Sequence, residues 1–447
     1  QCSIGQGAGS GGSAGASDGS HGTSVMSRLS VWWEGQIMGT LFRDADGDLG
    51  FVYSSDWLAQ PAARAISTAL PLRIEPYGRR QTRSFFAGLL PEEGQRDAAA
   101  NALGLSRNND FALLDALGGD VAGALAIWPE GQIVPVYQPA SAPEPLTESA
   151  LATMLDSLPL RPLLAGQAGL RLSLAGAQNK VPVVVRDNQI YLPSPGQPTT
   201  HILKPEMTRF AGSVENEAFV MRLAKAIGLS VAPVDPRVVQ GRKFLLIERY
   251  DRRLGPDGSM HRVHQEDFCQ ALGHQPESKY AAEGGPTFKT SFSLVRSVTT
   301  RPAIEVLKLL DAAIFNLIIG NADAHGKNFS LLYSPSGGTV LAPLYDLLCT
   351  LAWPHVATRM AMKIGRAGAL EGLSPQAWEK FSEDAGLGMP FVRKRVLELC
   401  QLVTGALQDV EKDLEDRDLS SGTLRSLGAI IAKRAAGVAS VSAPKTA

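Results

Sequence analysis

The segment Leu310–Leu347, LDAAIFNLIIGNADAHGKNFSLLYSPSGGTVLAPLYDL, changes its periodicity halfway along its length. Apolar residues at helical spacing up to Ile319 predict a helix that ends at Gly320, because glycine tolerates the backbone conformation that terminates helices. From Phe329 the period becomes two residues, and a turn rich in Ser, Pro and Gly separates two such runs. This pattern predicts a β-hairpin after the helix.

The polar loop between the helix and the hairpin carries Asp323, His325, Lys327 and Asn328. The hairpin is expected to return Asp346 toward Asp323. Phosphoryl transfer needs one carboxylate to accept the proton of the attacking hydroxyl, and oxygen ligands for Mg²⁺. Asp323 and Asn328 have the Asp-to-Asn spacing of a protein-kinase catalytic loop. Taken alone, the motif equally fits a solvated Asn/Asp-rich loop without chemistry.

Composition limits the class of protein. The 447 residues are 44% apolar and 19% charged, which predicts a globular protein of two or three domains. The net charge of −1 gives no general attraction to nucleic acid or membrane surfaces. The four cysteines have no metal-ligand spacing, which favours buried thiols in a reducing compartment. No apolar run reaches the roughly 18 residues of a membrane span, so we expect a cytoplasmic protein.

Changes in composition along the chain predict its domain boundaries. Residues 1–25 are dominated by Gly and Ser and are expected to be a disordered tag or linker. Four prolines within 135–145 predict a linker between domains. The expected units are a β-rich subdomain at 26–138, a nucleotide-binding lobe at 146–250, a helical catalytic lobe at 251–438 and a tail at 439–447.

The second informative region begins with a loop of small residues, Gly166–Lys180, that leads into a strand. Small residues allow backbone N–H groups to approach phosphate oxygens, although a plain turn has the same composition. Lys204 follows in a short apolar strand, the context of a phosphate-binding lysine. Glu217 lies thirteen residues later in a predicted helix, Val214–Ile227. Either it pairs with Lys204, or it is an exposed acid of the first helical turn.

The strand Lys243–Glu248 runs into a charged connector at Tyr250–Arg253, where a two-lobed kinase would have its hinge. After the connector the apolar spacing becomes helical. The expected helices are Gln265–Leu272, Pro302–Ile319, Pro375–Ala385, Phe391–Leu407 and Ser420–Ala435, followed by a frayed end from Gly437.

Several segments resemble the HipA family of serine/threonine-protein kinase toxins over residues from about 28 to about 410. The central ones are SLAGAQNK at 173–180, HILKP at 201–205 and GNADAHGKNFS with LYD within 320–346. FFAGLLPEEG, SVENEAFVMRLAKAIGLSVAP, ERYDRR, HQEDFCQALG and ESKYAAEGGP are also similar to that family. Each motif is short, but their combination and order are specific.

The resemblance implies an α+β, two-lobed protein-kinase-like fold with an N-terminal β-rich subdomain and an all-helical C-terminal lobe. It implies an ATP- and Mg²⁺-dependent kinase that modifies a protein hydroxyl, in the family's best-known case that of glutamyl-tRNA synthetase, an aminoacyl-tRNA synthetase. The implied partners are a HipB-like DNA-binding antitoxin and, through that complex, operator DNA. No membrane partner is implied.

Matching the motifs residue by residue assigns Asp323 as the catalytic base and Asn328 and Asp346 as Mg²⁺ ligands. Ser173 matches a serine that family members phosphorylate on themselves as an off-switch. The residues implied to bind the nucleotide are Ser173, Ala175, Gly176, Ala177, Gln178, Lys180, Lys204, Glu248, Tyr250, His325 and Lys327. Gly326 is expected to make the catalytic loop looser than a bulkier residue would.

Two other functions fit the same motifs. Kinases of sugars and antibiotics also combine Asp-x₄-Asn with a second metal-binding Asp, so a small-molecule phosphotransferase is one alternative. The other is a protein that acts chiefly as the co-repressor subunit of a toxin–antitoxin complex on operator DNA.

Overall fold

A computed structural model of the chain describes residues 27–44, 46–135, 137, 143–334, 337–417 and 419–443. The segment 1–25, interpreted above as a tag, lies outside the described residues, as does part of the predicted linker. No helix in the described ranges is both long and apolar enough to cross a membrane.

An antiparallel four-stranded sheet with the order β3-β2-β1-β4 forms the N-terminal subdomain. Most positions of its strands are buried, and rings from Phe51, Phe85 and Phe86 pack together. The elements are β1 Arg28–Trp33, β2 Gln36–Arg43, β3 Leu49–Tyr53, α1 Ser55–Leu58, α2 Arg79–Phe86, η1 Ala87–Leu89, α3 Glu93–Leu103, α4 Asp110–Leu117 and β4 Leu125–Pro129.

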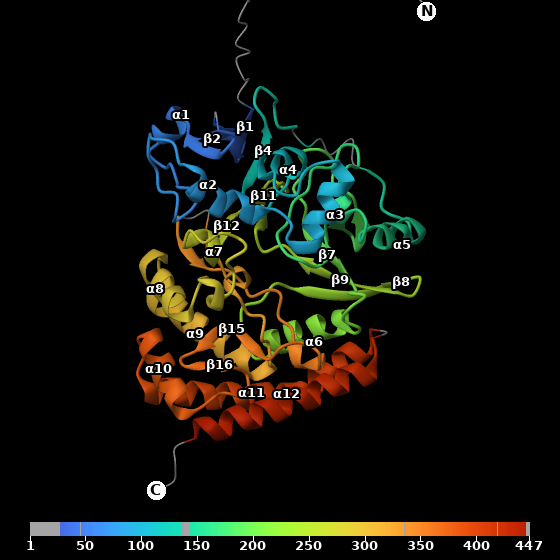
Figure 1. Ribbon diagram of the computed structural model, residues 1–447. Helices are drawn as coiled ribbons and strands as arrows, with labels where there is room; N and C mark the ends of the chain where they lie inside the picture. Colours follow the sequence, from blue (N-terminus) through green and yellow to red (C-terminus); the bar gives the residue numbers. More distant parts are fainter. Residues whose placement is uncertain are drawn as a thin grey trace, which may run out of the picture.

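A second antiparallel sheet, β6-β5-β7-β9-β8, forms the lobe that the sequence analysis expects to bind a nucleotide. Strand β7 lies in its middle and pairs with β5 and β9, so Lys204 projects from a fixed central strand. Helix α6 packs against β8 and β9 (Figure 1). The elements are α5 Glu148–Ser157, η3 Pro162–Leu164, β5 Val181–Arg186, β6 Gln189–Tyr191, β7 His201–Pro205, α6 Ser213–Ala226, β8 Val234–Val239 and β9 Arg242–Glu248.

The C-terminal lobe is mainly helical, and its last two long helices lie at the end of the molecule opposite the N-terminal sheet (Figure 1). The elements are β10 Arg252–Leu254, β11 Met260–Arg262, β12 His264–Asp267, α7 Phe268–Ala271, η4 Ala281–Glu283, α8 Phe288–Val298, α9 Pro302–Ile319, η5 Gly326–Asn328, β13 Ser330–Tyr333, β14 Thr339–Leu341, η6 Thr350–Ala352, β15 Arg359–Ile364, β16 Ala367–Ala369, α10 Pro375–Ala385, α11 Met389–Glu415 and α12 Ser421–Ser442.

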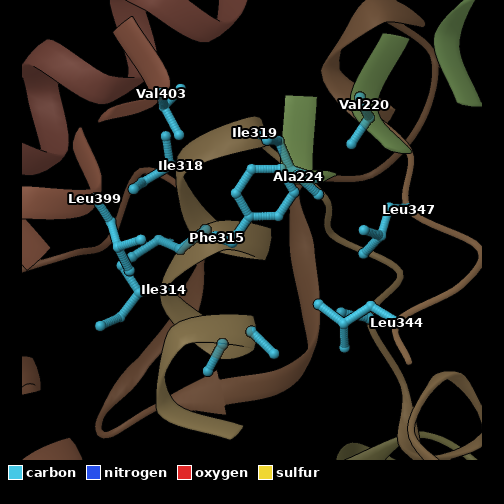
Figure 2. Packing of buried hydrophobic residues seen from close by; sticks show 14 of the residues in the cluster. Val220, Ala224, Ile314, Phe315, Ile318, Ile319, Leu344, Leu347, Leu399 and Val403 are labelled. Atoms are coloured by element: carbon cyan, nitrogen blue, oxygen red, sulfur yellow. The ribbon is translucent and has the colours of Figure 1, made fainter. Parts of the chain in front are cut away.

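Helix α9 is the buried axis of this lobe. Its residues Ile314, Phe315, Ile318 and Ile319 have no exposed surface. Figure 2 shows these side chains between Leu399 and Val403 of α11 on one side and Val220 and Ala224 of α6 on the other. A helix that is enclosed in this way cannot shift without losing apolar burial along its whole length. The loop that leaves its C-terminus therefore starts from a fixed point.

The predicted hairpin is confirmed, since β13 and β14 pair antiparallel with Leu331 opposite Leu341. It adds to β12 in a three-stranded sheet, so the C-terminal lobe is not all-helical. The prediction of helix over Gln265–Leu272 was accordingly wrong in its first part. Gln265 pairs with Leu332 as a strand residue, and this long-range pairing overrides the local helical spacing.

The expected frayed end was also wrong over Gly437–Ser442. Helix α12 continues to Ser442, and Val438 and Ser442 are buried. Buried positions at Ala435, Val438 and Ser442 keep the helical period, so packing on the neighbouring helices extends α12 beyond the stretch with strong apolar content. Residues 444–447 lie outside the described ranges.

Candidate active site

The predicted catalytic loop, residues 321–328, is attached rigidly to the end of α9. Gly320 ends the helix with φ 73°, and a Cβ at this position would lie 2.6 Å from a methyl carbon of Leu351. Asn321 Oδ1 accepts a hydrogen bond from the Asp323 N–H at 3.0 Å. The Thr350 hydroxyl donates to the Gly320 carbonyl at 2.9 Å and accepts from the Ala322 N–H at 3.0 Å. These bonds fix the backbone that carries Asp323.

Asp323 combines accessibility with a raised pKa. One side of the residue is open to solvent, but burial of the carboxylate among protein groups raises its pKa to about 6. The Tyr280 hydroxyl donates to Asp323 Oδ1 at 3.0 Å and opposes this rise. The charge of Asp346 raises the pKa further, so the two acids are close enough to interact, as the hairpin prediction requires. A carboxylate with this pKa is charged at neutral pH and suited to accept a proton.

Asn328 and Gly326 shape the rest of the loop. The Asn328 amide donates from Nδ2 to the Asp323 carbonyl at 3.2 Å, which closes the loop on itself. The expectation that Gly326 loosens the loop was wrong. A Cβ at Gly326 would lie 2.5 Å from Pro286 Cγ and 3.0 Å from Cys269 Sγ. Glycine is needed here because the segment packs too closely for any side chain.

Lys204 connects the two lobes. Its Nζ lies 2.7 Å from Glu217 Oε1 and 2.7 Å from Asp346 Oδ1. Glu217 is only 2% exposed, so the predicted pair with Lys204 is confirmed and the exposed first-turn position is excluded. Burial alone would lower the pKa of Lys204, but Asp346 and Glu217 together raise it above its ordinary value. Lys204 therefore stays charged at neutral pH.

Asp346 occupies an unusual backbone position. Its φ of 56° lies in the left-handed region, which costs a non-glycine residue free energy. Burial would raise the pKa of its carboxyl, but the positive charges of Lys204 and Lys180 hold that pKa far below the ordinary range. A carboxylate that remains ionised and partly accessible is a good ligand for a hard divalent cation.

The loop of small residues lies beside this charged group. Gly176 has φ 115°, and a Cβ here would meet Lys180 Nζ at 2.4 Å, so the lysine folds directly over the glycine. Lys180 donates to the Ala175 carbonyl at 2.6 Å, and Gln178 donates to the Pro205 carbonyl at 3.5 Å. Burial lowers the pKa of Lys180 to about 8, and the nearby charge of Lys204 acts in the same direction. Ala177 is exposed at the tip of the loop.

Ser173 differs from the rest of the loop because it is fully buried. Its hydroxyl donates to the Leu89 carbonyl at 2.8 Å, and its N–H donates to the Asp120 carbonyl at 3.0 Å. Both acceptors belong to the N-terminal subdomain. In this conformation the hydroxyl is not available for chemistry.

Two predicted residues of the catalytic loop are buried. His325 is 7% exposed, burial lowers its pKa to about 4, and its Nδ1 has no hydrogen-bond partner among the described residues. Lys327 Nζ contacts Asp267 Oδ2 at 3.1 Å, Glu92 Oε1 at 3.5 Å and the Gly88 carbonyl at 3.2 Å. Its ammonium therefore lies in the interface with the N-terminal subdomain and away from the ion pair of Lys204 with Asp346.

The connector after β9 has the position of a hinge. Glu248 ends the strand and is exposed, whereas Tyr250 packs on the Tyr345 ring with 5.7 Å between centroids. The Tyr250 hydroxyl donates to Gln265 of β12. Tyr345 in turn donates to the Lys327 carbonyl at 2.6 Å, so the connector is tied to the catalytic loop.

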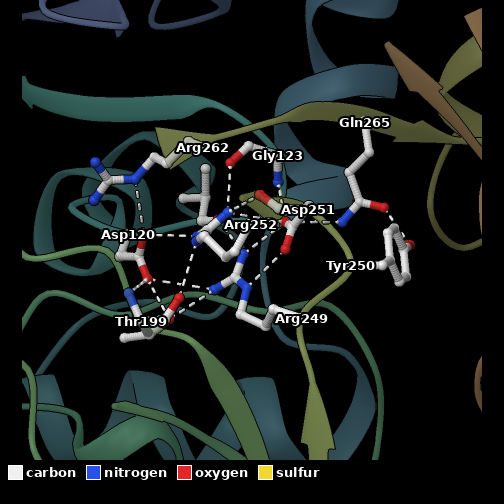
Figure 3. Close-up of polar contacts among 10 residues, drawn as sticks. Asp120, Gly123, Thr199, Arg249, Tyr250, Asp251, Arg252, Arg262 and Gln265 are labelled. Carbon is white, nitrogen blue, oxygen red and sulfur yellow. Dashed lines mark hydrogen bonds and ion pairs between the residues drawn. The ribbon is translucent and has the colours of Figure 1, made fainter. Parts of the chain in front are cut away.

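Buried charges hold this connector in place (Figure 3). Asp120 of the N-terminal subdomain contacts Arg252 at 2.9 Å, Arg262 at 3.1 Å and Arg249 at 3.3 Å. Asp251 contacts Arg249 at 2.7 Å. The sequence analysis assigned no role to this group, because nothing local shows that Asp120 meets three arginines that lie 129 to 142 residues further along the chain.

The donors at the site fit a nucleotide with a divalent cation. Asn328 and Asp346 offer amide and carboxylate oxygens, the atoms that Mg²⁺ prefers. Lys204 and Lys180 supply positive charge beside them, and the backbone around Gly176 allows close approach of phosphate. Tyr280 and Lys279 were missed by the sequence analysis. Both lie in the ESKYAAEGGP segment, where no periodicity or motif of known chemistry marks them.

The fold is protein-kinase-like. A β-rich lobe and a helical lobe meet at the loop of Asp323 and Asn328, at the strand lysine Lys204 and at the second acid, Asp346. The model of the HipA N-terminal domain matches residues 29–128, and that of the HipA-like C-terminal domain matches residues 172–409. The chain belongs to the HipA family of kinases.

Individual relatives agree with this assignment. A Sinorhizobium fredii protein named "Putative kinase Y4mE" is 56% identical over 91% of this chain and 97% of its own length. The serine/threonine-protein kinase toxin HipA of Shewanella oneidensis is 33% identical over 79% of this chain and 82% of its own. The solved complex of Shewanella oneidensis HipA with HipB and operator DNA superimposes with a TM-score of 0.80 at 28% identity, covering 94% of this chain and all of that one. The predicted family and two-lobed fold are confirmed.

Proposed function

We propose that this protein is an ATP- and Mg²⁺-dependent serine/threonine protein kinase of the toxin type. The observation that carries the proposal is the meeting of Asp346 with Lys204 at 2.7 Å, beside an Asp323 whose pKa is about 6. The pair of Asp346 and Lys204 suits the binding of a metal and phosphates, and Asp323 suits proton acceptance. The buried side chains of His325 and Lys327 support the loop that carries Asp323 and Asn328.

When bound, Mg²⁺–ATP supplies an electrophilic γ-phosphoryl group whose charge the metal neutralises. Asn328 and Asp346 provide ligand oxygens, while Lys204 and Lys180 face the phosphates together with the backbone of residues 175–178. Glu248 and Tyr250 hold the adenine side. Asp323 would orient the substrate hydroxyl and accept its proton, while the hydroxyl oxygen bonds to the γ-phosphorus and the bond from that phosphorus to the bridging oxygen breaks to release ADP.

The proposed macromolecular substrate is a translation protein such as an aminoacyl-tRNA synthetase, and the proposed site of action is the cytoplasm. A HipB-like antitoxin is the proposed partner, and operator DNA is reached through that complex. The support is the likeness to HipA in its complex with HipB and operator DNA. A gel-shift with operator DNA tests this part, and Asp323→Ala is expected to abolish phosphorylation while preserving repression.

Autophosphorylation of Ser173 is the proposed off-switch. The buried hydroxyl must leave Leu89 before it is modified, so the Gly-rich loop has to detach first. A doubly charged phosphate has no place in the buried position and would draw cations toward it. Arg171 and Lys180 are the local candidates, and Arg171 Nη1 is buried with no hydrogen-bond partner in the part of the chain that the structure describes. Mass spectrometry after incubation with ATP tests this step.

The decisive experiment is incubation of the wild type and Asp323→Ala with labelled ATP and Mg²⁺, in a cell lysate freed of nucleotides. We expect labelled protein only with the wild type, carrying phosphoserine or phosphothreonine. Label in a small alcohol and none in protein would instead identify a small-molecule phosphotransferase.

A further inference from the structure

We propose that Glu92 is a positioning residue through which the N-terminal subdomain holds the Gly-rich loop and the catalytic loop in a fixed relation. The inference rests on the proposed function, because it takes the first loop as the phosphate cradle and the second as the carrier of the base. Glu92 itself belongs to neither loop. It lies in the segment that precedes α3, within the FFAGLLPEEG motif.

The Gly-rich loop is held mainly by this subdomain. The Glu92 N–H donates to the Gly176 carbonyl at 3.1 Å, within a short parallel bridge between Pro91 and Gly176. A second bridge joins Asp120 to Leu172, next to the contacts of Ser173 described above. The conformation of residues 172–176 therefore depends on where the subdomain lies.

The Glu92 carboxylate reaches the other loop. It lies 2.9 Å from Lys279 Nζ through Oε2 and 3.5 Å from Lys327 Nζ through Oε1. All three side chains are at most 11% exposed, so the ion pairs are poorly screened by solvent. Burial would raise the pKa of Glu92, but the charges of Lys327 and Lys279 lower it below the ordinary value. Glu92 is consequently ionised when it bridges the two lysines.

Both lysines belong to segments that carry or contact Asp323. Lys327 is part of the catalytic loop itself, and the Lys279 carbonyl accepts from the Gly326 N–H at 3.3 Å. The residue after Lys279 is Tyr280, which donates to Asp323. One residue thus links the two loops, since the Glu92 backbone N–H contacts Gly176 and its carboxylate contacts Lys279 and Lys327 near Asp323. Without the charge of Glu92, Lys327 keeps its ion pair with Asp267. Among the described residues, buried Lys279 then keeps only the ion pair with Glu93, whose side chain is 63% exposed.

Glu92→Gln tests the inference, because it removes the charge and preserves side-chain size and the backbone N–H. The matched control is Asp97→Asn, which breaks the exposed pair of Asp97 with Arg107 in the same subdomain. We expect Glu92→Gln to raise the KM for ATP, lower kcat and reduce kcat/KM by about 10- to 100-fold, since small displacements of positioned groups have effects of this size. Hydrogen exchange should accelerate in peptides covering 171–180 and 321–328. The control should match the wild type in all four readouts.

Wild-type values of KM, kcat and loop exchange in folded Glu92→Gln would overturn the inference. Faster exchange spread over the whole chain or lower thermal stability alone, with unchanged kinetics, would also overturn it. If Glu92→Gln does not fold, Lys279→Gln removes one of the two bridges and should give the same pattern more weakly. Absence of phosphorylation by the wild type would instead contradict the proposed function, so the two failures are distinguishable.

Discussion

The Lys204 ammonium lies 2.7 Å from Asp346 Oδ1, although 142 residues separate the two in the sequence. Lys204 comes from β7, the central strand of the five-stranded sheet, and Asp346 comes from the chain that follows the β13–β14 hairpin. Because Lys204 also contacts Glu217, a single buried cation compensates two acids. This arrangement gives the ion pair a role in stability besides its proposed role in nucleotide binding.

Lys204→Met should abolish phosphoryl transfer and lower the stability of the fold. Glu217, 2% exposed, loses its partner, and breaking a buried ion pair typically costs about 3–5 kcal/mol. Chemical denaturation and ATP titration measure the two effects. Lys225→Met on the exposed side of α6 is the control and should leave both unchanged. Retention of ATP affinity by Lys204→Met would contradict the assigned role.

Activity should depend on pH through Asp323. Only the ionised carboxylate accepts a proton, so kcat/KM should be half-maximal near pH 6 and decline below it, with a slope of about one logarithmic unit per pH unit. Asp323→Asn should remove the activity at every pH. An acid limb centred near pH 4, the ordinary range of an aspartate, would contradict the raised pKa of Asp323.

Tyr280→Phe should move that acid limb toward higher pH. The hydroxyl stabilises the ionised form of Asp323, so its removal raises the pKa of the carboxyl. The measurement is the pH profile of kcat/KM for both proteins. Tyr191→Phe, whose hydroxyl contacts only Gln189 among the described residues, serves as the control. A limb that stays in place or moves to lower pH would contradict the contact.

Asp120→Asn should destabilise the protein strongly, whereas Asp156→Asn should leave its melting temperature nearly unchanged. Asp120 compensates three arginines in a buried setting, and its loss should cost about 3–5 kcal/mol. Asp156 forms one solvent-exposed pair. The lowered pKa of Asp120 means that its contribution is complete above pH 3.8 and is lost as pH falls toward the depressed value. Equal melting temperatures of the two variants would contradict the assignment.

Ser173→Glu should detach the Gly-rich loop and reduce activity at least tenfold, because it places a charge in a fully buried position. Ser173→Ala should retain the loop, since it removes only one hydrogen bond, worth about 1 kcal/mol. Limited proteolysis of 166–180 and phosphorylation assays report the two properties. An active Ser173→Glu variant with a protected loop would argue against the proposed switch.

Much of the catalytic lobe follows from local sequence. The helix end at Gly320 and the hairpin were predictable because period and turn residues are properties of contiguous segments. Spacing left the pairing of Lys204 with Glu217 as one of two possibilities, and the fold decides between them. Helix α10 has the predicted bounds, from Pro375 to Ala385, since proline begins it and the residue after Ala385, Gly386, ends it with φ 60°.

The contacts around the site were not predictable in the same way. Glu92, Lys279 and Tyr280 lie in segments without regular periodicity, and their roles depend on which distant residues they meet. The sequence analysis expected Gly326 to loosen the loop. In the fold Pro286 approaches Gly326 so closely that the glycine allows tight packing instead. Spacing along a chain predicts a residue's neighbours only within one element or one hairpin. Long-range ion pairs and tight packing need the assembled fold.

The most direct test of the central claim is a crystal structure with a non-hydrolysable ATP analogue and Mg²⁺. The account predicts a metal held by oxygens of Asn328 and Asp346, phosphates within reach of Lys204 and the 173–180 loop, and Asp323 facing the γ-phosphate. A nucleotide bound where neither Lys204 nor that loop touches it would contradict the account.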